Sequence, residues 1–72
     1  MESKTDISII SPIYNEEDNI INFVNAVYRT MSSQSCNWEL ILVDDGSTDT
    51  SRALLRSLAK DHHNLRVLLL SK

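Results

Sequence analysis

Residues 38–47 read Trp-Glu-Leu-Ile-Leu-Val-Asp-Asp-Gly-Ser, and this stretch decides the fold. Residues 40–43 within it are all apolar, and two acidic residues, a glycine and a serine follow them directly. A short unbroken apolar run that ends in a turn is typical of a strand in a parallel sheet with helices on both faces. We therefore expect a strand over residues 38–44, buried on both faces, and a turn in which Gly46 takes a positive φ.

A strand and a helix are predicted before this stretch. Residues 7–13 are mostly apolar and β-branched, which predicts a strand that ends at Pro12, because proline cannot donate a hydrogen bond to a sheet. Apolar residues at helical spacing over residues 20–31 predict a helix. We expect Asn15 to be its N-cap, with the acidic residues 16–18 in the first turn, where the helix dipole favours negative charge.

A second helix and a third strand are predicted after it. Leucines at helical spacing indicate the helix, and we expect its cap within residues 47–48. Asp49 and Arg52 are expected to form an ion pair three positions apart. We expect Asn64 to close the helix in the left-handed conformation, and residues 66–70 predict the last strand.

The order strand, helix, strand, helix, strand predicts a protein of the α/β class with a parallel sheet and right-handed crossovers, a Rossmann-like βαβαβ unit. Three strands and two helices cannot cover both faces of such a sheet well. We therefore expect residues 1–72 to form a single partial domain, the first part of a larger one, with residues 1–5 disordered. The exposed edge of the sheet is expected to promote self-association.

Composition narrows the class of protein. Hydrophobic residues make up 42% of the 72 residues and charged residues 24%, as in soluble globular proteins. The net charge of -3 argues against a nucleic-acid-binding module, which normally has a basic face. The single cysteine, Cys36, cannot form an internal disulfide. Because the apolar runs are too short to span a bilayer and no signal peptide is predicted, we expect a cytoplasmic protein.

Two polar clusters follow the first two predicted strands, where ligands bind in open α/β sheets. One contains Tyr14 and Glu16, and the other contains the pair Asp44 and Asp45. An aromatic ring can stack on a nucleobase, and a carboxylate can accept hydrogen bonds from a base or a ribose. Each residue also has a purely structural interpretation: the ring could close the sheet end, the glutamate could sit in a helical first turn, and the aspartates could shape the turn.

Two stretches in these clusters resemble a known family. Residues 7–17, Ile-Ser-Ile-Ile-Ser-Pro-Ile-Tyr-Asn-Glu-Glu, resemble the opening of family 2 glycosyltransferases, and residues 39–49 resemble that family's second-strand signature. The details are most similar to the branch that transfers a sugar to polyprenyl or dolichol phosphate. The resemblance implies a GT-A fold that binds a nucleotide-diphosphate sugar, and a lipid-phosphate or saccharide acceptor in a membrane-associated parent enzyme at the cytoplasmic face.

The resemblance also assigns roles to individual residues. Five positions are implied to bind the nucleotide sugar: Pro12, Tyr14, Glu16, Val43 and Asp45. The ring of Tyr14 would flank the base above a turn shaped by Pro12, and Glu16 would hold the ribose. The backbone of Val43 and the carboxylate of Asp45 would hold the base. Asp44 is instead expected to support the turn.

The metal-binding part of the family's site is expected to lie outside this sequence. The family's Asp-x-Asp motif, which holds a divalent metal on the diphosphate, comes after the third strand, beyond Lys72. We therefore expect Mg²⁺ or Mn²⁺ in the full-length parent and no ion bound tightly by this fragment. No catalytic residue is expected within it, and without metal or phosphate contacts the fragment itself is expected to be inactive.

Base-edge chemistry predicts which donor the parent uses. An ionised carboxylate accepts hydrogen bonds but cannot donate them, so Asp45 suits a base with a ring N–H. Uracil and guanine present one, whereas adenine and cytosine present a lone pair. We therefore expect a UDP- or GDP-linked sugar.

Two other classes of function remain open from the residues alone. In a receiver-type signalling domain, paired acidic residues at a strand end bind Mg²⁺, and the pair Asp44 and Asp45 fits that pattern locally. Against it, the receiver's acidic pair follows the first strand, whereas another strand and a helix precede it here. The third possibility is a docking module in which the aspartates are only structural. The single glycine excludes Gly-rich dinucleotide and P-loop motifs.

Overall fold

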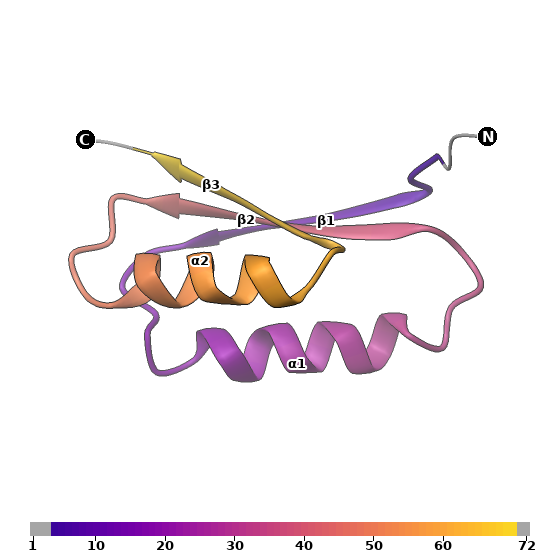
Figure 1. The fold of residues 1–72 in the computed structure, drawn as a ribbon, viewed down its shortest axis with the longest axis horizontal. Coiled ribbons are helices and arrows are strands. Elements are labelled where there is room, and N and C mark those ends of the chain that lie inside the picture. Colours follow the sequence, from indigo (N-terminus) through magenta and orange to yellow (C-terminus); the bar gives the residue numbers. More distant parts are fainter. Residues whose placement is uncertain (1–3, 71–72) are drawn as a thin grey trace.

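The computed structural model describes residues 4–70, which form three strands and two helices (Figure 1). In chain order these are β1 (Ile7–Ile13), α1 (Ile20–Met31), β2 (Trp38–Asp45), α2 (Ser51–Asp61) and β3 (Leu65–Leu70). The strands are parallel and lie in the order β1-β2-β3. The predicted α/β class and the alternation of strands and helices are therefore confirmed.

Residues 1–5 are expected to be disordered, and residues 1–3 of this segment lie outside the described residues. Residues 4 and 5 are described. The carbonyl of Lys4 accepts a hydrogen bond of 2.9 Å from the side-chain amide of Asn37, just before β2.

Both helices lie on the same face of the sheet (Figure 1). Each right-handed crossover advances one strand in the same direction, from β1 to β2 and from β2 to β3, which places both connecting helices on one side. The prediction that β2 is buried on both faces is therefore wrong. Its residues Leu40 and Leu42 are fully buried against the helices, whereas Ile41 and Val43, on the other face, are only half-buried.

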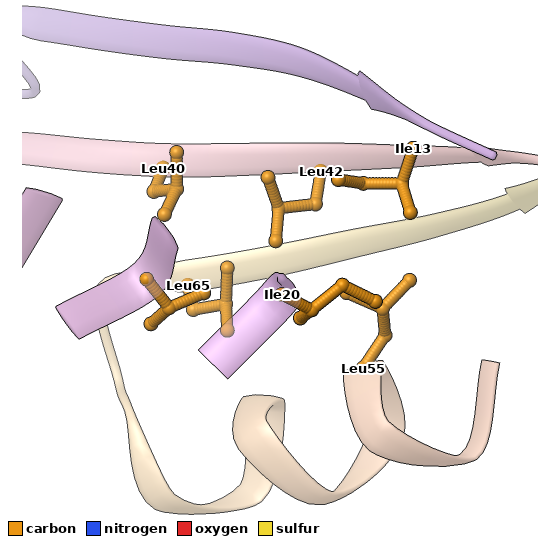
Figure 2. Close-up of a cluster of buried hydrophobic side chains, with 7 residues drawn as sticks. Ile13, Ile20, Leu40, Leu42, Leu55 and Leu65 are labelled. Atoms are coloured by element: carbon orange, nitrogen blue, oxygen red, sulfur yellow. The ribbon is translucent and has the colours of Figure 1, made fainter. Parts of the chain in front are cut away.

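The core lies between β2 and the two helices (Figure 2). Its buried apolar side chains come from all five elements: Ile13, Ile20, Val24, Leu40, Leu42, Leu55 and Leu65. Burying one such side chain stabilises the fold by about 1.5–3 kcal/mol. A slip of one residue in strand pairing would turn Leu40 and Leu42 to the opposite face, so this core also fixes the register, in which Ile13 lies opposite Asp44.

The open face of the sheet carries no helix from residues 4–70 and divides into two parts. Toward the amino ends of the strands, Glu39 accepts a hydrogen bond of 2.6 Å from Ser8 and pairs with Arg66 at 3.0 Å. Toward the carboxyl ends it is apolar, with Ile10 and Leu68 exposed by 66% and 54%. No helix within the described range is long and apolar enough to cross a membrane.

Both helices begin later than the sequence predicts. α1 starts at Ile20 after Asn19, so Asn15 is not its N-cap, and residues 16–18 precede the helix instead of forming its first turn. The carbonyl of Glu16 accepts hydrogen bonds from the N–H groups of Asn19 and Ile20, which makes an additional turn before the helix. The side chain of Asn15, which is expected to cap α1, instead contacts the loop that follows β2.

The second helix differs from its prediction at both ends. α2 begins at Ser51 after Thr50, so the expected cap within residues 47–48 is wrong. At the other end, His62 is extended, with φ of -128°, and Asn64 has no positive φ. The side-chain amide of Asn64 donates to the carbonyl of Trp38 at 2.8 Å, which ties the start of β3 to β2 in place of a left-handed helix end.

Candidate functional site

The two loops that follow β1 and β2 lie side by side at the carboxyl ends of the strands (Figure 1). Ile13, the last residue of β1, pairs with Asp44 of β2, and Pro12 pairs with Val43. Tyr14 and Asp45 come next in each chain segment, Tyr14 as the first residue after β1 and Asp45 as the last residue of β2, so they lie at the same level of the sheet. The expected meeting of the two polar clusters at one edge is confirmed for the backbone that carries them.

The two adjacent aspartates serve opposite faces. Successive side chains of a strand alternate, and Asp44 points toward the helices, where its side chain is fully buried, while Asp45 is exposed. One oxygen of Asp44, Oδ2, accepts a hydrogen bond of 3.1 Å from the N–H of Ser47. The prediction that Asp44 supports the turn is therefore confirmed. The turn also contains Gly46 with φ of 77°, the positive value expected for it.

Asp44 is held by an arginine that the sequence does not point to. Arg52 Nε of α2 lies 2.9 Å from Asp44 Oδ2, in an ion pair whose angle falls short of a hydrogen bond. Arg52 Nη2 also donates to the carbonyl of Leu70 at 2.8 Å. The predicted pair of Asp49 with Arg52 is wrong, because the guanidinium turns inward to a buried carboxylate that needs a counter-charge.

The remaining residues implied to bind a nucleotide sugar lie at the same corner of the molecule, which is formed by the carboxyl ends of β1 and β2 and the two loops that follow them. Tyr14 is 53% exposed, and Glu16 is exposed, with its Oε2 accepting a hydrogen bond of 3.1 Å from the side-chain amide of Asn19. Pro12 is exposed and Val43 half-buried, and they lie side by side on the open face, the face to which Asp45 also belongs. The corner therefore combines the accessible ring of Tyr14, the accessible carboxylates of Glu16 and Asp45, and an apolar surface formed by Pro12 and Val43.

The corner adjoins a hollow in the surface. A cavity of about 210 Å³ lies beside Glu16, between the end of β1 and the start of α1, and Phe23 forms part of its wall. A larger cavity of about 330 Å³ lies at the other end of the sheet, around Trp38, Glu39 and Arg66. We place the functional site at the first end, because ligands of open α/β sheets bind beyond the carboxyl ends of the strands.

Asn15 is the residue of this corner that sequence reasoning missed. It has φ of 49° and no role as a cap, and its side chain reaches across to the loop after β2. The available signal was its residue type, since asparagine is among the few non-glycine residues that tolerate positive φ.

Ionisation of Asp49 is tied to the same contact between loops. Partial desolvation raises the pKa of Asp49, but hydrogen bonds from Ser51 and Glu17 outweigh it and lower the pKa below its ordinary value. The backbone N–H of Ser51 donates to Asp49 Oδ1 at 2.9 Å, and that of Glu17 donates to Oδ2 at 3.3 Å. Both bonds are strongest to the charged carboxylate.

The residues of this corner do not fit a divalent metal. A metal ion needs several converging oxygen ligands, and no three His, Cys, Asp or Glu side chains between residues 4 and 70 are arranged around one point. Asp44 and Asp45 cannot act as a pair, because they lie on opposite faces and Asp44 is already engaged by Arg52.

Comparison with known proteins identifies relatives with this sequence pattern. The model of the family described as Glycosyl transferase family 2 matches residues 8–72. The undecaprenyl-phosphate 4-deoxy-4-formamido-L-arabinose transferase of Proteus mirabilis (strain HI4320) is 34% identical over 65 residues, which cover 88% of this chain and 20% of the relative. The transferase of the same name from Pectobacterium carotovorum subsp. carotovorum (strain PC1) is 38% identical, with the same coverage. The chain spans about a fifth of the length of these curated relatives.

Proposed function

Because the chain belongs to glycosyl transferase family 2, we propose that residues 4–70 form the nucleotide-binding part of an enzyme that transfers a sugar from a UDP- or GDP-linked donor to a polyprenyl phosphate. The family match excludes the receiver-type signalling domain. The observation that carries the proposal is that the two adjacent aspartates at the end of β2 differ in burial. Asp44 is buried against the helices, whereas Asp45 is exposed on the open face, and Tyr14, also exposed, follows the residue of β1 that pairs with Asp44.

Tyr14 and Asp45 have complementary roles in holding the base. The ring of Tyr14 is half exposed and can stack on any base, for about 1–3 kcal/mol. Stacking alone does not discriminate between bases. The carboxylate of Asp45 supplies discrimination, because it accepts a hydrogen bond from the ring N–H of uracil or guanine and meets a lone pair in adenine or cytosine.

The other three residues complete the proposed nucleotide site. Glu16 accepts hydrogen bonds from the ribose hydroxyls, each worth roughly 1.5–3 kcal/mol when the acceptor is charged. The backbone of Val43 contacts the base, and Pro12, its neighbour across the two strands, shapes the surface beneath it.

The acceptor and the setting of the whole enzyme follow from the relatives. Their names give undecaprenyl phosphate as the acceptor, and we assign the same class of acceptor here. A polyprenyl chain is a membrane lipid, while nucleotide sugars are water-soluble, so the reaction would occur at a membrane surface, and we propose the cytoplasmic one. A divalent metal on the diphosphate would neutralise charge at the leaving group. The described residues offer no set of side chains that could hold such an ion, and we expect them to be inactive by themselves.

The test is competition among UDP, GDP, ADP and CDP for binding to the chain. Binding is measured from changes in amide chemical shifts. We expect UDP or GDP to perturb Tyr14 and Asp45 with dissociation constants on the order of millimolar, about -4 kcal/mol. Asp45→Asn should remove the preference over ADP and CDP. Asp61→Asn is the matched control, since Asp61 is an exposed carboxylate at the end of α2, at the opposite end of the sheet. A preference for ADP, or perturbations that avoid both loops, would refute the assignment.

A further inference from the structure

Asn15 joins the loop after β1 to the loop after β2. Its φ of 49° makes it the only non-glycine residue between residues 4 and 70 with a positive value. Its backbone N–H donates to Ser47 Oγ at 2.9 Å. Its side-chain Oδ1 accepts the N–H of Thr48 at 2.8 Å and that of Asp49 at 3.4 Å. One residue of the first loop thus contacts three consecutive residues of the second.

Further hydrogen bonds join the same two loops closer to the helices. The N–H of Glu16 donates to Ser51 Oγ at 3.0 Å, and Ser51 is fully buried. The hydroxyl of Thr50 donates to Glu17 Oε2 at 3.1 Å. These contacts position the start of each helix. They lie farther along the chain from Tyr14 and Asp45 than the contacts of Asn15 do.

The contacts of Asn15 lie between the two groups that would bind the base. Asn15 follows Tyr14 directly, and Ser47 follows Asp45 by two residues. Ser47 is itself fixed, because it is buried and its N–H is bound to Asp44. A displacement of Tyr14 relative to Asp45 would therefore disrupt the bonds of Asn15 to the second loop.

We propose that Asn15 is a positioning residue of the nucleotide site, which holds the ring of Tyr14 in fixed register with the carboxylate of Asp45. The effect of Asn15 on nucleotide binding rests on the proposed function, whereas its effect on the two loops does not. The fixed relation of the two loops is a property of the free chain. Stacking and base discrimination then act on the same nucleobase because one residue links the segment that contains Tyr14 to the loop that follows Asp45.

Two properties of Asn15 can be separated by substitution. Asn15→Gly keeps the freedom to adopt a positive φ but removes the Oδ1 acceptor. Asn15→Asp keeps an acceptor and a side chain that tolerates this conformation. The matched control is Asn64→Gly, which removes a side-chain hydrogen bond of 2.8 Å to Trp38 at the opposite end of the sheet.

The first experiment uses the free chain and needs no nucleotide. In Asn15→Gly, we expect the amide of Thr48 to exchange with solvent at least tenfold faster relative to core amides such as that of Leu42, and the amide resonances of Tyr14 and Asp45 to shift. Asn15→Asp should retain the protection of Thr48, and Asn64→Gly should leave both loops unchanged. Unchanged exchange at Thr48 and unchanged loop resonances in Asn15→Gly would overturn the proposal.

The second experiment measures the ratio of the dissociation constants of ADP and UDP, or of ADP and GDP if GDP binds better. All are diphosphates, so the charge added in Asn15→Asp cancels in the ratio. We expect Asn15→Gly to reduce the ratio at least threefold and Asn15→Asp to keep it within twofold. A merely structural residue would weaken all nucleotides equally, and that result would refute the positioning role.

The two experiments distinguish the failure of either idea. If the wild-type chain binds no nucleotide at these loops, the proposed function fails, and the exchange of Thr48 still decides whether Asn15 fixes the loops. If nucleotides bind with the expected preference and Asn15→Gly changes neither exchange nor ratio, the positioning role fails alone. Where Asn15→Gly does not fold, Ser47→Ala removes the Oγ that accepts the N–H of Asn15 and is expected to lower the ratio in the same direction.

Discussion

Replacing Arg52 by leucine tests whether the buried carboxylate of Asp44 depends on its counter-charge. The side chain of Asp44 is fully buried, that of Arg52 is 31% exposed, and Nε lies 2.9 Å from Oδ2. The other oxygen of Asp44, Oδ1, is buried without a hydrogen bond. Arg52→Leu would leave this carboxylate in the core with only the N–H of Ser47 as a partner.

The expected magnitude follows from the exposure of the two groups. Unit charges 2.9 Å apart attract by about 6 kcal/mol at an effective dielectric constant of 20, and their desolvation offsets much of this. Removing one partner of a fully buried pair costs about 3–5 kcal/mol. Because Arg52 is partly exposed, water screens its charge and weakens the ion pair. We therefore expect Arg52→Leu to lower the free energy of unfolding by about 2–3 kcal/mol. For a domain of this size, that lowers Tm by roughly 10–20 °C.

Urea unfolding, followed by the fluorescence of Trp38, measures this loss. Arg56→Leu is the matched control, since Arg56 is an exposed arginine one turn farther along α2 and is expected to change stability by less than about 0.5 kcal/mol. Adding Asp44→Asn to each variant completes a double-mutant cycle, with an expected coupling of about 1–3 kcal/mol. If Arg52→Leu costs no more than Arg56→Leu, or if the coupling is near zero, the buried ion pair does not stabilise the fold.

Four further outcomes follow from other parts of the molecule. Leu42→Ala should cost about 2–5 kcal/mol in urea unfolding, whereas Leu68→Ala on the open face should cost under about 1 kcal/mol; equal costs would contradict the one-sided core. Burial raises the pKa of Tyr28, and the weak contact of its hydroxyl with the backbone of Asn64, which lacks the geometry of a full hydrogen bond, offsets this only in part. Ionisation of Tyr28 therefore costs more in the folded state than in the unfolded state, and stability is lost as the pH rises above about 10; Tyr28→Phe should be neutral or stabilising at pH 7 and should reduce the loss in alkali. The lowered pKa of Asp49 gives stability that is present above about pH 4 and lost on further acidification, so Asp49→Asn should flatten the dependence of the urea midpoint between pH 6 and 3. The unpaired edges of β1 and β3 should promote self-association, seen as concentration-dependent sedimentation; a concentration-independent monomer that melts above about 60 °C would contradict this.

The sequence is sufficient to predict the elements and their order because both depend on local periodicity. β1 begins at Ile7 as expected but continues one residue past Pro12, and β2 and β3 each differ from their expected bounds by one residue at one end. The sequence does not predict that β2 is buried on only one face, because an unbroken apolar run is compatible with either a covered or an open second face. Only the direction of the two crossovers determines that both helices pack on one side.

The predicted helix starts are wrong for a different physical reason. Asn15, Ser47 and Thr48 are residue types that cap helices, and their groups do bond to backbone or side-chain partners near helix starts. In the fold they bond across to the other loop, more than 30 residues away in sequence. A local rule identifies the hydrogen-bonding capacity of such residues but cannot choose between a partner three residues away and one brought near by strand pairing. The same limit applies to Arg52, whose partner is Asp44 and not the nearby Asp49.

The adjacent aspartates connect the register of the sheet to the chemistry of the site. Leu40, Leu42 and Asp44 share the helix-covered face, and Val43 and Asp45 share the open one. A slip of one residue in β2 would bury Asp45, expose Asp44, and turn both leucines away from the core. The apolar side chains therefore do more than stabilise the strand. By excluding the slipped register, they determine which of two chemically identical carboxylates is held by Arg52 and which remains accessible to a ligand.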